Sequence, residues 1–191
     1  MMMGVRQSAK YVMNEEMFDD ITDSDFKKKY MYELTAMKTK NMKLFEFYDF
    51  SPRVFYRIRS MYGISSEMYM KSVGPENLIG SLCMGNISSL KESCSTGKSG
   101  SFFYYTADSR FMLKTISHQE FTHLKVILKE YFLHLSSNPN SLITRFFGLH
   151  KIKYDKNFGK MRVYFVIMAN VFNTSREINV RYDLKGSTLG R

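Results

Sequence analysis

A serine- and glycine-containing loop and two lysines are the residues of this chain with the most specific chemistry. The loop is Ser95–Ser101, Lys114 lies in an apolar segment after it, and Lys185 lies in the polar segment Asp183–Arg191. Backbone amides of a glycine-containing loop and lysine ammonium groups both bind phosphate oxygens. The pattern therefore favours a nucleotide phosphate site.

The loop does not fit the P-loop pattern, although Gly97-Lys98-Ser99 matches the last three residues of that pattern. A P-loop needs an earlier glycine at position 92, which is Glu92, and a helix immediately after the loop. Here the aromatic run Phe102–Tyr105 predicts a strand instead. The loop is therefore expected to be a hairpin lid, with the lysine on a later strand as in protein kinases. The alternative for Lys114 is an edge lysine whose stem packs on apolar surface.

Glu120 is the candidate partner of Lys114, because kinases pair the strand lysine with a helix glutamate. The alternative is a structural role, since Ser117-His118-Gln119-Glu120 has the form of a capping box. The helix that begins there carries apolar residues at spacings of three and four and is expected to end at Asn138-Pro139-Asn140.

The elements around these residues predict an antiparallel α+β fold. Ser51 and Pro52 predict a helix start, with Ser51 as the cap, and Gly63 predicts its end. We also expect a helix over Phe26–Met37. The expected strands and hairpins are Phe102–Tyr105 with Arg110–Ile116, a strand from Phe146, a buried strand Val163–Met168, and an alternating strand over residues 178–184.

The basic charge is concentrated after residue 50. Residues 1–50 carry 8 basic and 9 acidic residues, whereas residues 51–191 carry 20 and 9, within a formal net charge of +10. Arg53, Arg57 and Arg59 are expected on the polar face of the helix after Pro52, either as a solvated face or facing an anion. Such a surplus attracts nucleic acid, nucleotides or an anionic membrane, and charge alone does not choose among them.

Several segments in the same order resemble the phosphatidylinositol phosphate kinase family, nearest to the type that makes phosphatidylinositol 4,5-bisphosphate from the 4-phosphate. The most specific is Arg181–Thr188, which is close to the signature of that family. Ser99–Tyr104 resembles the glycine-rich loop of the family, and Phe111–Thr115 resembles its lysine strand. Phe146–His150 and Val166–Phe172 resemble the two strands around the hinge. Gly4–Arg6 resembles the start of the domain, and Phe47–Phe55 resembles the entry to its helix.

The resemblance implies that residues 46–191 form the N-terminal lobe and hinge of a kinase domain. Residues 1–45 would be a partly exposed extension and the start of that domain. Lys114 would hold the α- and β-phosphates of ATP, and Asn170 and Val171 would meet the adenine. Ser99, Gly100 and Ser101 would cover the phosphates, and Lys185 would lie at the phosphate end.

The resemblance also implies what the site would use. The cofactors would be ATP and Mg²⁺, but the aspartates that bind magnesium and act on the substrate hydroxyl are expected after Arg191. No catalytic residue or metal ligand is therefore expected in this chain, and the chain alone is expected to be an inactive fragment. The alternative is a non-catalytic, truncated homologue that binds an anionic membrane or a partner kinase.

The expected partners are ATP, a phosphoinositide in an anionic membrane and, as the family allows, a second copy in a homodimer. Nucleic acid is not expected, because no motif for it is present. The expected location is the cytoplasm, peripheral at the cytosolic face of the plasma membrane, with Arg53, Arg57 and Arg59 facing the lipid. No secretory signal or long apolar run is visible, and Cys83 and Cys94 are expected to be reduced thiols.

Overall fold

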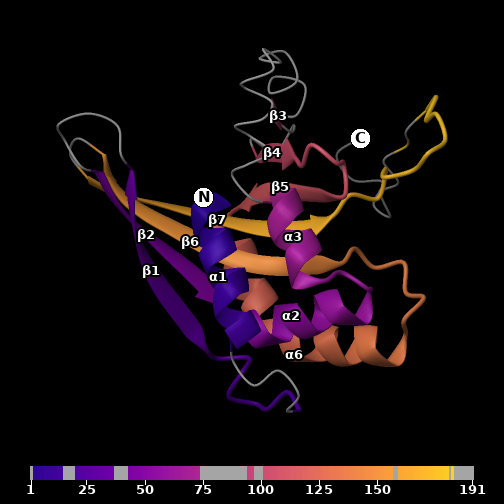
Figure 1. Cartoon of the computed structure of the whole chain (residues 1–191), viewed down its shortest axis with the longest axis horizontal. Coiled ribbons are helices and arrows are strands. Elements are labelled where there is room, and N and C mark those ends of the chain that lie inside the picture. Colours follow the sequence, from indigo (N-terminus) through magenta and orange to yellow (C-terminus); the bar gives the residue numbers. More distant parts are fainter. Residues whose placement is uncertain are drawn as a thin grey trace.

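The computed structural model describes residues 2–14, 20–36, 43–73, 94–96, 101–156, 159–180 and 182. Within these residues, one antiparallel sheet has the strand order β1-β2-β6-β7-β5-β4-β3, and helices pack on both of its faces (Figure 1). The expected antiparallel α+β fold is confirmed. No helix in this described part is long and apolar enough to cross a membrane.

The bounds of the elements follow. The strands are β1 (Lys29–Ala36), β2 (Lys43–Phe50), β3 (Cys94–Thr96), β4 (Phe102–Tyr105), β5 (Phe111–Ile116), β6 (Phe146–Lys156) and β7 (Gly159–Ala169). The described helices are α1 (Met2–Asn14), α2 (Pro52–Met61), α3 (Ser66–Val73) and α6 (His118–Ser137).

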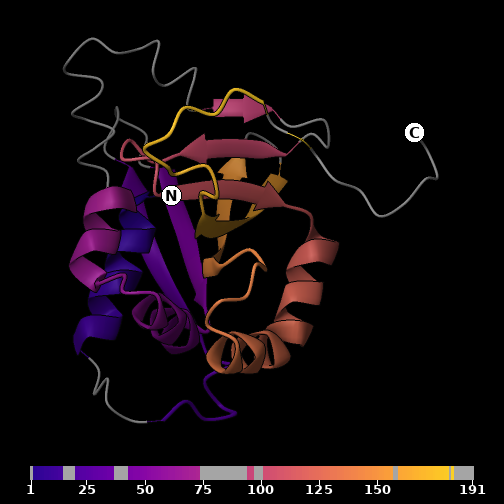
Figure 2. The same ribbon diagram turned by 90° about the vertical axis from the view of Figure 1, so that its right-hand side faces the viewer.

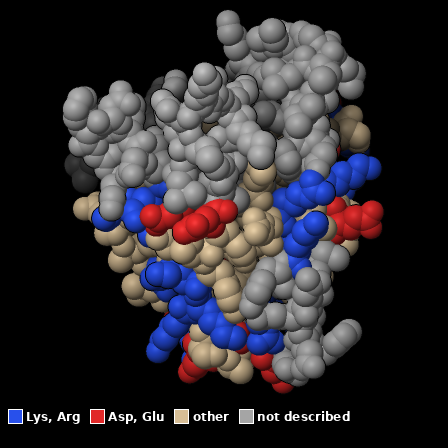
Figure 3. All heavy atoms as spheres, turned by 60° about the vertical axis from the view of Figure 1, so that its left-hand side comes forward, with Lys and Arg blue, Asp and Glu red and all other residues tan. Residues whose placement is uncertain are grey.

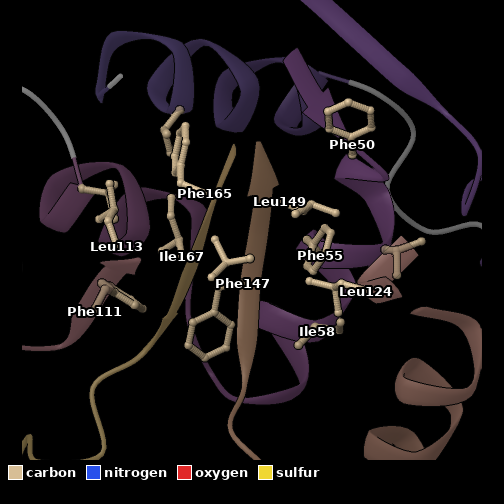
Figure 4. Packing of buried hydrophobic residues seen from close by; sticks show 14 of the residues in the cluster. Phe50, Phe55, Ile58, Phe111, Leu113, Leu124, Phe147, Leu149, Phe165 and Ile167 are labelled. Carbon is tan, nitrogen blue, oxygen red and sulfur yellow. The ribbon is translucent and has the colours of Figure 1, made fainter. Parts of the chain in front are cut away.

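The two faces of the sheet carry different helices, with α1 and α3 on one side and α6 on the other (Figure 2). On the first face, Phe111 of β5 contacts Tyr69 of α3 edge-on, with ring centroids 5.5 Å apart. Phe111 also meets Phe147 of β6 at 5.6 Å. These side chains belong to the main core (Figure 4), where full burial of such a side chain is worth about 1.5–3 kcal/mol.

The second face holds the residue of most chemical interest. Lys114 of β5 lies opposite Val166 of β7. Val166 lies opposite Leu149 of β6 on its other side, and Leu149 lies opposite Phe50 of β2. Residues directly opposite in adjacent strands share a face, so all four project to the same side. Phe50 meets Phe121 of α6 at 4.8 Å, which identifies this side as the α6 face.

A bulge interrupts β6 between Phe146 and Gly148, opposite β7. Phe146 pairs with Met168 and Gly148 pairs with Ile167, so Phe147 is an extra residue without a direct partner on β7. After the bulge the pairing is regular, with Leu149 on the α6 face and His150 on the α1 face.

Several local predictions are confirmed. Strands β4 and β5 form the predicted hairpin, α6 begins with the predicted capping box and has Asn138 at its C-cap, and Gly63 ends α2 with φ of 68°. Ser51, however, does not cap α2. Its backbone has φ of 50°, and its hydroxyl donates instead to the Phe26 carbonyl at 2.9 Å.

Two predicted elements are wrong. The segment Phe26–Met37 is not a helix, because residues 29–36 form β1 and pair along their whole length with β2. Pairing with a neighbouring strand outweighs a weak local propensity. Residues 178–180 and 182 are not in a strand, since alternation of apolar residues does not by itself supply a neighbouring strand to pair with.

The predicted extension contributes to the core of the lobe. Val5 and Ala9 of α1 are buried, and β1 is part of the sheet. The predicted division at residue 45 falls within β2. The position of the division itself stays a prediction.

Candidate nucleotide site

Lys114 lies near the end of β5, between β4 and β7. Its ammonium nitrogen is 3.8 Å from Oε1 of Glu120 and 5.9 Å from the centre of the Phe103 ring. The side chain is 28% exposed, so the ammonium group is partly shielded but can still reach a ligand. The structure therefore brings together the two residues that the sequence singled out, on the α6 face.

Glu120 performs its structural role at the same time. Its Oε2 accepts a hydrogen bond from the Ser117 amide at 2.7 Å, and its own amide donates to the Ser117 hydroxyl at 3.1 Å. Hydrogen bonds with Ser117, and then the charge of Lys114, lower the pKa of Glu120 despite the opposing effect of burial. The two predicted roles are compatible, because one carboxylate oxygen serves the helix and the other faces the lysine.

The predicted hinge follows β7 at Asn170, which is fixed to the turn between β4 and β5. The Asn170 side-chain amide donates to the Ser109 carbonyl at 2.7 Å, and its backbone amide donates to the Arg110 carbonyl at 3.0 Å. The Asn170 side-chain oxygen accepts from the amide of Phe172 at 3.1 Å. The Asn170 carbonyl also accepts from the Asn173 amide at 3.1 Å. Because these bonds use both the side chain and the backbone groups of Asn170, a ligand at the predicted hinge would meet the exposed Val171.

The hinge and the lysine lie at a spacing that suits a nucleotide. Lys114 is opposite Val166, and Asn170 is four residues further along that strand direction. At about 3.3 Å per residue, this corresponds to roughly 13 Å along the sheet. An adenine near the hinge and a phosphate chain near Lys114 would therefore extend along β5 and β7.

The predicted lid is described only at its two ends, where Ser95 and Thr96 belong to β3 and Ser101 precedes β4. Ser101 is half-buried, and the next amide, that of Phe102, donates to the Thr115 hydroxyl at 2.8 Å, which joins the end of the lid to the lysine strand. Ser99, Gly100 and Lys185 lie outside the described residues.

The three arginines predicted to face a membrane do not share one exposed face, and for Arg59 the prediction is wrong. Arg59 is 5% exposed, donates to the Phe147 carbonyl at 2.6 Å and lies over the Tyr69 ring at 4.3 Å. It follows Phe55 by four residues, which is one helical turn, so both project to the core. Arg53 is half-buried against Asp25 at 3.3 Å, and only Arg57 is exposed.

The sequence reasoning missed a buried polar group beneath α1. The hydroxyl of Ser8 donates to Oδ2 of Asp49, and Oδ1 of Asp49 lies 3.1 Å from Nδ1 of His150. The alternation of side chains along each strand could have indicated this burial. Asp49 follows the core residue Phe47 by two positions, and His150 follows Gly148 by two, so each lies on the buried face of its strand. Their burial in the core indicates a structural role.

No metal site is formed by the described part of the chain, where no three His, Cys, Asp or Glu side chains gather as a metal ion requires.

The chain was compared with known proteins. Residues 84–191 match the family described as phosphatidylinositol-4-phosphate 5-kinase. A phosphatidylinositol 4-phosphate 5-kinase of Plasmodium falciparum is 40% identical over all of this chain and 11% of its own length. One of Schizosaccharomyces pombe is 39% identical over 90% of this chain and 22% of its own length. A probable phosphatidylinositol phosphate kinase of Dictyostelium discoideum is 43% identical over 77% of this chain and 19% of its own length.

The chain thus spans between 11% and 22% of the length of these curated relatives. Within the chain itself, however, the aligned stretches cover between 77% and 100%, and the family match contains β5, Glu120 and β7. The chain belongs to the phosphatidylinositol-4-phosphate 5-kinase family.

Proposed function

We propose that this chain is the nucleotide-binding lobe of an enzyme that transfers the γ-phosphoryl group of ATP to phosphatidylinositol 4-phosphate, giving phosphatidylinositol 4,5-bisphosphate. The observation that carries the proposal is the ion pair between Lys114 and Glu120, whose charged atoms are 3.8 Å apart. Lys114 is on β5, which pairs with β7, and Glu120 is on α6. Family membership supports the use of ATP.

The lysine and glutamate act together in this proposal. The ammonium group of Lys114 would hold the α- and β-phosphates and offset part of their negative charge. Glu120 would orient that ammonium group, and the capping bonds with Ser117 would fix Glu120 itself. Positioning and charge stabilisation supply most of the catalysis in phosphoryl transfer.

The remaining groups bind the rest of the nucleotide. Val171 would meet the adenine directly, and Asn170 would hold this part of the backbone in place, because its side chain and its backbone amide bind the turn between β4 and β5. Ser99, Gly100 and Ser101 would cover the phosphates, and Lys185 would lie at their far end. Magnesium, when bound, would neutralise charge on the phosphates, and its ligands are not assigned to the described residues.

ATP binding to the chain tests the proposal. Fluorescent ATP-analogue titration, with displacement by ATP, should give saturable binding that Lys114→Met weakens at least tenfold. Lys27→Met serves as the matched control, because Lys27 is exposed and lies outside the proposed site. Equal affinity in the Lys114→Met and Lys27→Met proteins, or no saturable binding to the unaltered chain, would contradict the proposal.

A second candidate function is a non-catalytic module that binds an anionic membrane or a partner kinase. The net charge of +10 favours it, because each basic residue near an anionic leaflet contributes about 1 kcal/mol. Peripheral attachment at the cytosolic face of the plasma membrane, and a homodimer there, belong to the same proposal. On the side shown in Figure 3, however, acidic groups lie between the basic ones.

Vesicle binding tests this second function. Cosedimentation with phosphatidylcholine vesicles containing phosphatidylserine should be strong at low ionic strength and weaken steeply as salt rises, because surface charges are screened. Arg57→Gln should weaken it slightly, since Arg57 is the exposed arginine of α2. Binding that is insensitive to salt would point to insertion of apolar groups instead.

A further inference from the structure

Beyond the part that α6 covers, strands β1, β2, β6 and β7 have one buried face and one open face. Phe47 and Asp49 of β2 and Ile152 of β6 are buried on the α1 face. On the α6 face of the same strands, Met31 and Arg162 are exposed and Tyr48 and Lys151 are half-exposed. This open surface is separated from Lys114 by Phe121 of α6, which packs on Tyr164 of β7 at 4.6 Å.

Positive charge converges on one aromatic ring in this open surface. Lys151 lies directly opposite Tyr48, and its ammonium nitrogen is 3.7 Å from the centre of the Tyr48 ring. The ammonium nitrogen of Lys29 lies 5.4 Å from the centre of the same ring. Arg162 is on β7, next to β6 and opposite Lys153. We call Lys29, Lys151 and Arg162 around Tyr48 the Tyr48 cluster.

The nearby carboxylate is already engaged by other groups. Glu46 accepts from Lys153 with both oxygens, at 2.7 and 2.8 Å, and also from the Tyr48 hydroxyl. Among the described residues, no carboxylate lies within ion-pair distance of the three cations of the cluster. The cluster therefore holds more positive charge than its immediate surroundings compensate.

Lys151 shows the electrostatic cost of this arrangement. Its burial, followed by repulsion from Lys29, Arg162 and Lys153, lowers the pKa of Lys151, although the charge of Glu46 acts in the opposite direction. The face of the Tyr48 ring offsets only part of this cost, since a cation–π contact contributes about 0.5–2 kcal/mol. A ligand that brings several negative charges to this point would relieve the repulsion among the cations.

We propose that the Tyr48 cluster is a binding site for a compact anion carrying several phosphate groups. Lysine ammonium groups bind phosphate as point charges, and the fork of Arg162 suits two phosphate oxygens at once. A flat membrane fits less well, because Glu33 and Glu46 project on the same face of the neighbouring strands β1 and β2. The site does not depend on the proposed kinase activity, because it involves none of the residues assigned to ATP.

Titration of the chain with inorganic tripolyphosphate, with the heat of binding measured by calorimetry, tests the proposal. The unaltered chain should bind saturably, and Lys151→Met or Arg162→Gln should weaken binding at least tenfold. Lys27→Met removes one positive charge elsewhere and should have little effect. Because a triphosphate could also reach the proposed ATP site, the titration is repeated on Lys114→Met, which should retain the binding that depends on Lys151.

Thermal unfolding distinguishes a ligand site from a structural one. Lys151→Met keeps an apolar stem over Tyr48 and removes the repelled charge, so it should raise Tm in the absence of ligand. The same variant should lose the increase in Tm that tripolyphosphate gives to the unaltered chain. A lower Tm for Lys151→Met without ligand would indicate a structural role and overturn the proposal.

Vesicles distinguish a specific site from general attraction to a membrane. The same variants are tested with phosphatidylcholine vesicles containing phosphatidylserine, whose headgroups carry single phosphodiesters. Tripolyphosphate binding that depends on Lys151 and Arg162 supports the site. If those residues matter only for the vesicles, or if Lys27→Met weakens tripolyphosphate binding as much as Lys151→Met does, the cluster is a diffuse basic surface and the proposal fails.

Discussion

At the scale of the residue, Glu120 joins a structural function to a chemical one. One of its oxygens closes the capping box of α6, and the other faces Lys114. The two functions can be separated by substitution, because glutamine also serves at this position of a capping box but carries no charge.

We expect Glu120→Gln to leave Tm nearly unchanged and to weaken ATP binding, because the cap remains while the partner charge of Lys114 is lost. Glu120→Ala should weaken ATP binding as well and should also lower stability, by roughly 0.5–1 kcal/mol, because a capping bond is lost. Thermal unfolding and nucleotide titration of the two variants measure both effects. A large loss of Tm in Glu120→Gln would show that the charge is needed for folding.

Residue patterns predicted some of these positions and not others. Lys114 and Glu120 were found because a strand, a loop and a capping box each have a local signature. Arg59 was misplaced because the buried face of α2 is wider than the spacing of Val54, Phe55 and Ile58 suggested. The buried guanidinium group donates a hydrogen bond to the carbonyl of Phe147. Such a partner lies far away in the sequence and leaves no local signal.

At the scale of the element, the sequence predicted helices and strands whose ends are marked by local residues. It did not predict elements that form only because another part of the chain pairs with them. Helix α6 has a cap at each end, and its length followed from them. Strand β1 has alternating tyrosines at 30 and 32, but its identity depends on β2 alongside it. Helix α1 has neither a clear stripe nor a cap in the sequence, and it is held by packing on Phe47.

Substitution of Gly4 in α1 tests that packing. Alanine usually favours a helix over glycine by about 1 kcal/mol. Here the added methyl carbon would lie 2.2 Å from Cδ2 of the buried Phe47 ring, so we expect Gly4→Ala to destabilise the chain by about 1–3 kcal/mol. Urea denaturation measures the change, with exposed Gln7→Ala on the same helix as the control. A stabilised Gly4→Ala chain would show that α1 does not pack closely on the sheet.

At the scale of the whole molecule, acid stability depends on carboxylates that are held ionised. Burial alone would raise the pKa of Asp25 and of Asp108. Hydrogen bonds from Thr22 and Lys28 to Asp25, and from Ser72 and Thr106 to Asp108, bring both pKa values below the ordinary 3.8. The pKa of Glu120 is likewise below the ordinary 4.5. The folded chain therefore binds fewer protons than the unfolded chain in the acid range.

The sign of the pH dependence follows from these directions. The stabilisation is fully present above the ordinary carboxyl pKa values and is lost as pH falls below them through the lowered values of the folded state. We expect Tm to be nearly constant from about pH 7 to pH 5 and to fall steeply below about pH 4. The rising positive charge of a chain already at +10 adds to the fall. A main decrease between pH 7 and 5 would implicate histidine instead.

The extra residue at Phe147 is accommodated locally, because its neighbours Phe146 and Gly148 lie opposite the adjacent residues Met168 and Ile167 of β7. If Phe147 alone were removed, every later residue of β6 would keep its partner on β2 and β7 and its side of the sheet. The loss would be the buried Phe147 ring and the carbonyl that accepts from Arg59. Any relative of this chain that lacks the insertion would therefore need another buried acceptor for an arginine at position 59, or an uncharged residue there.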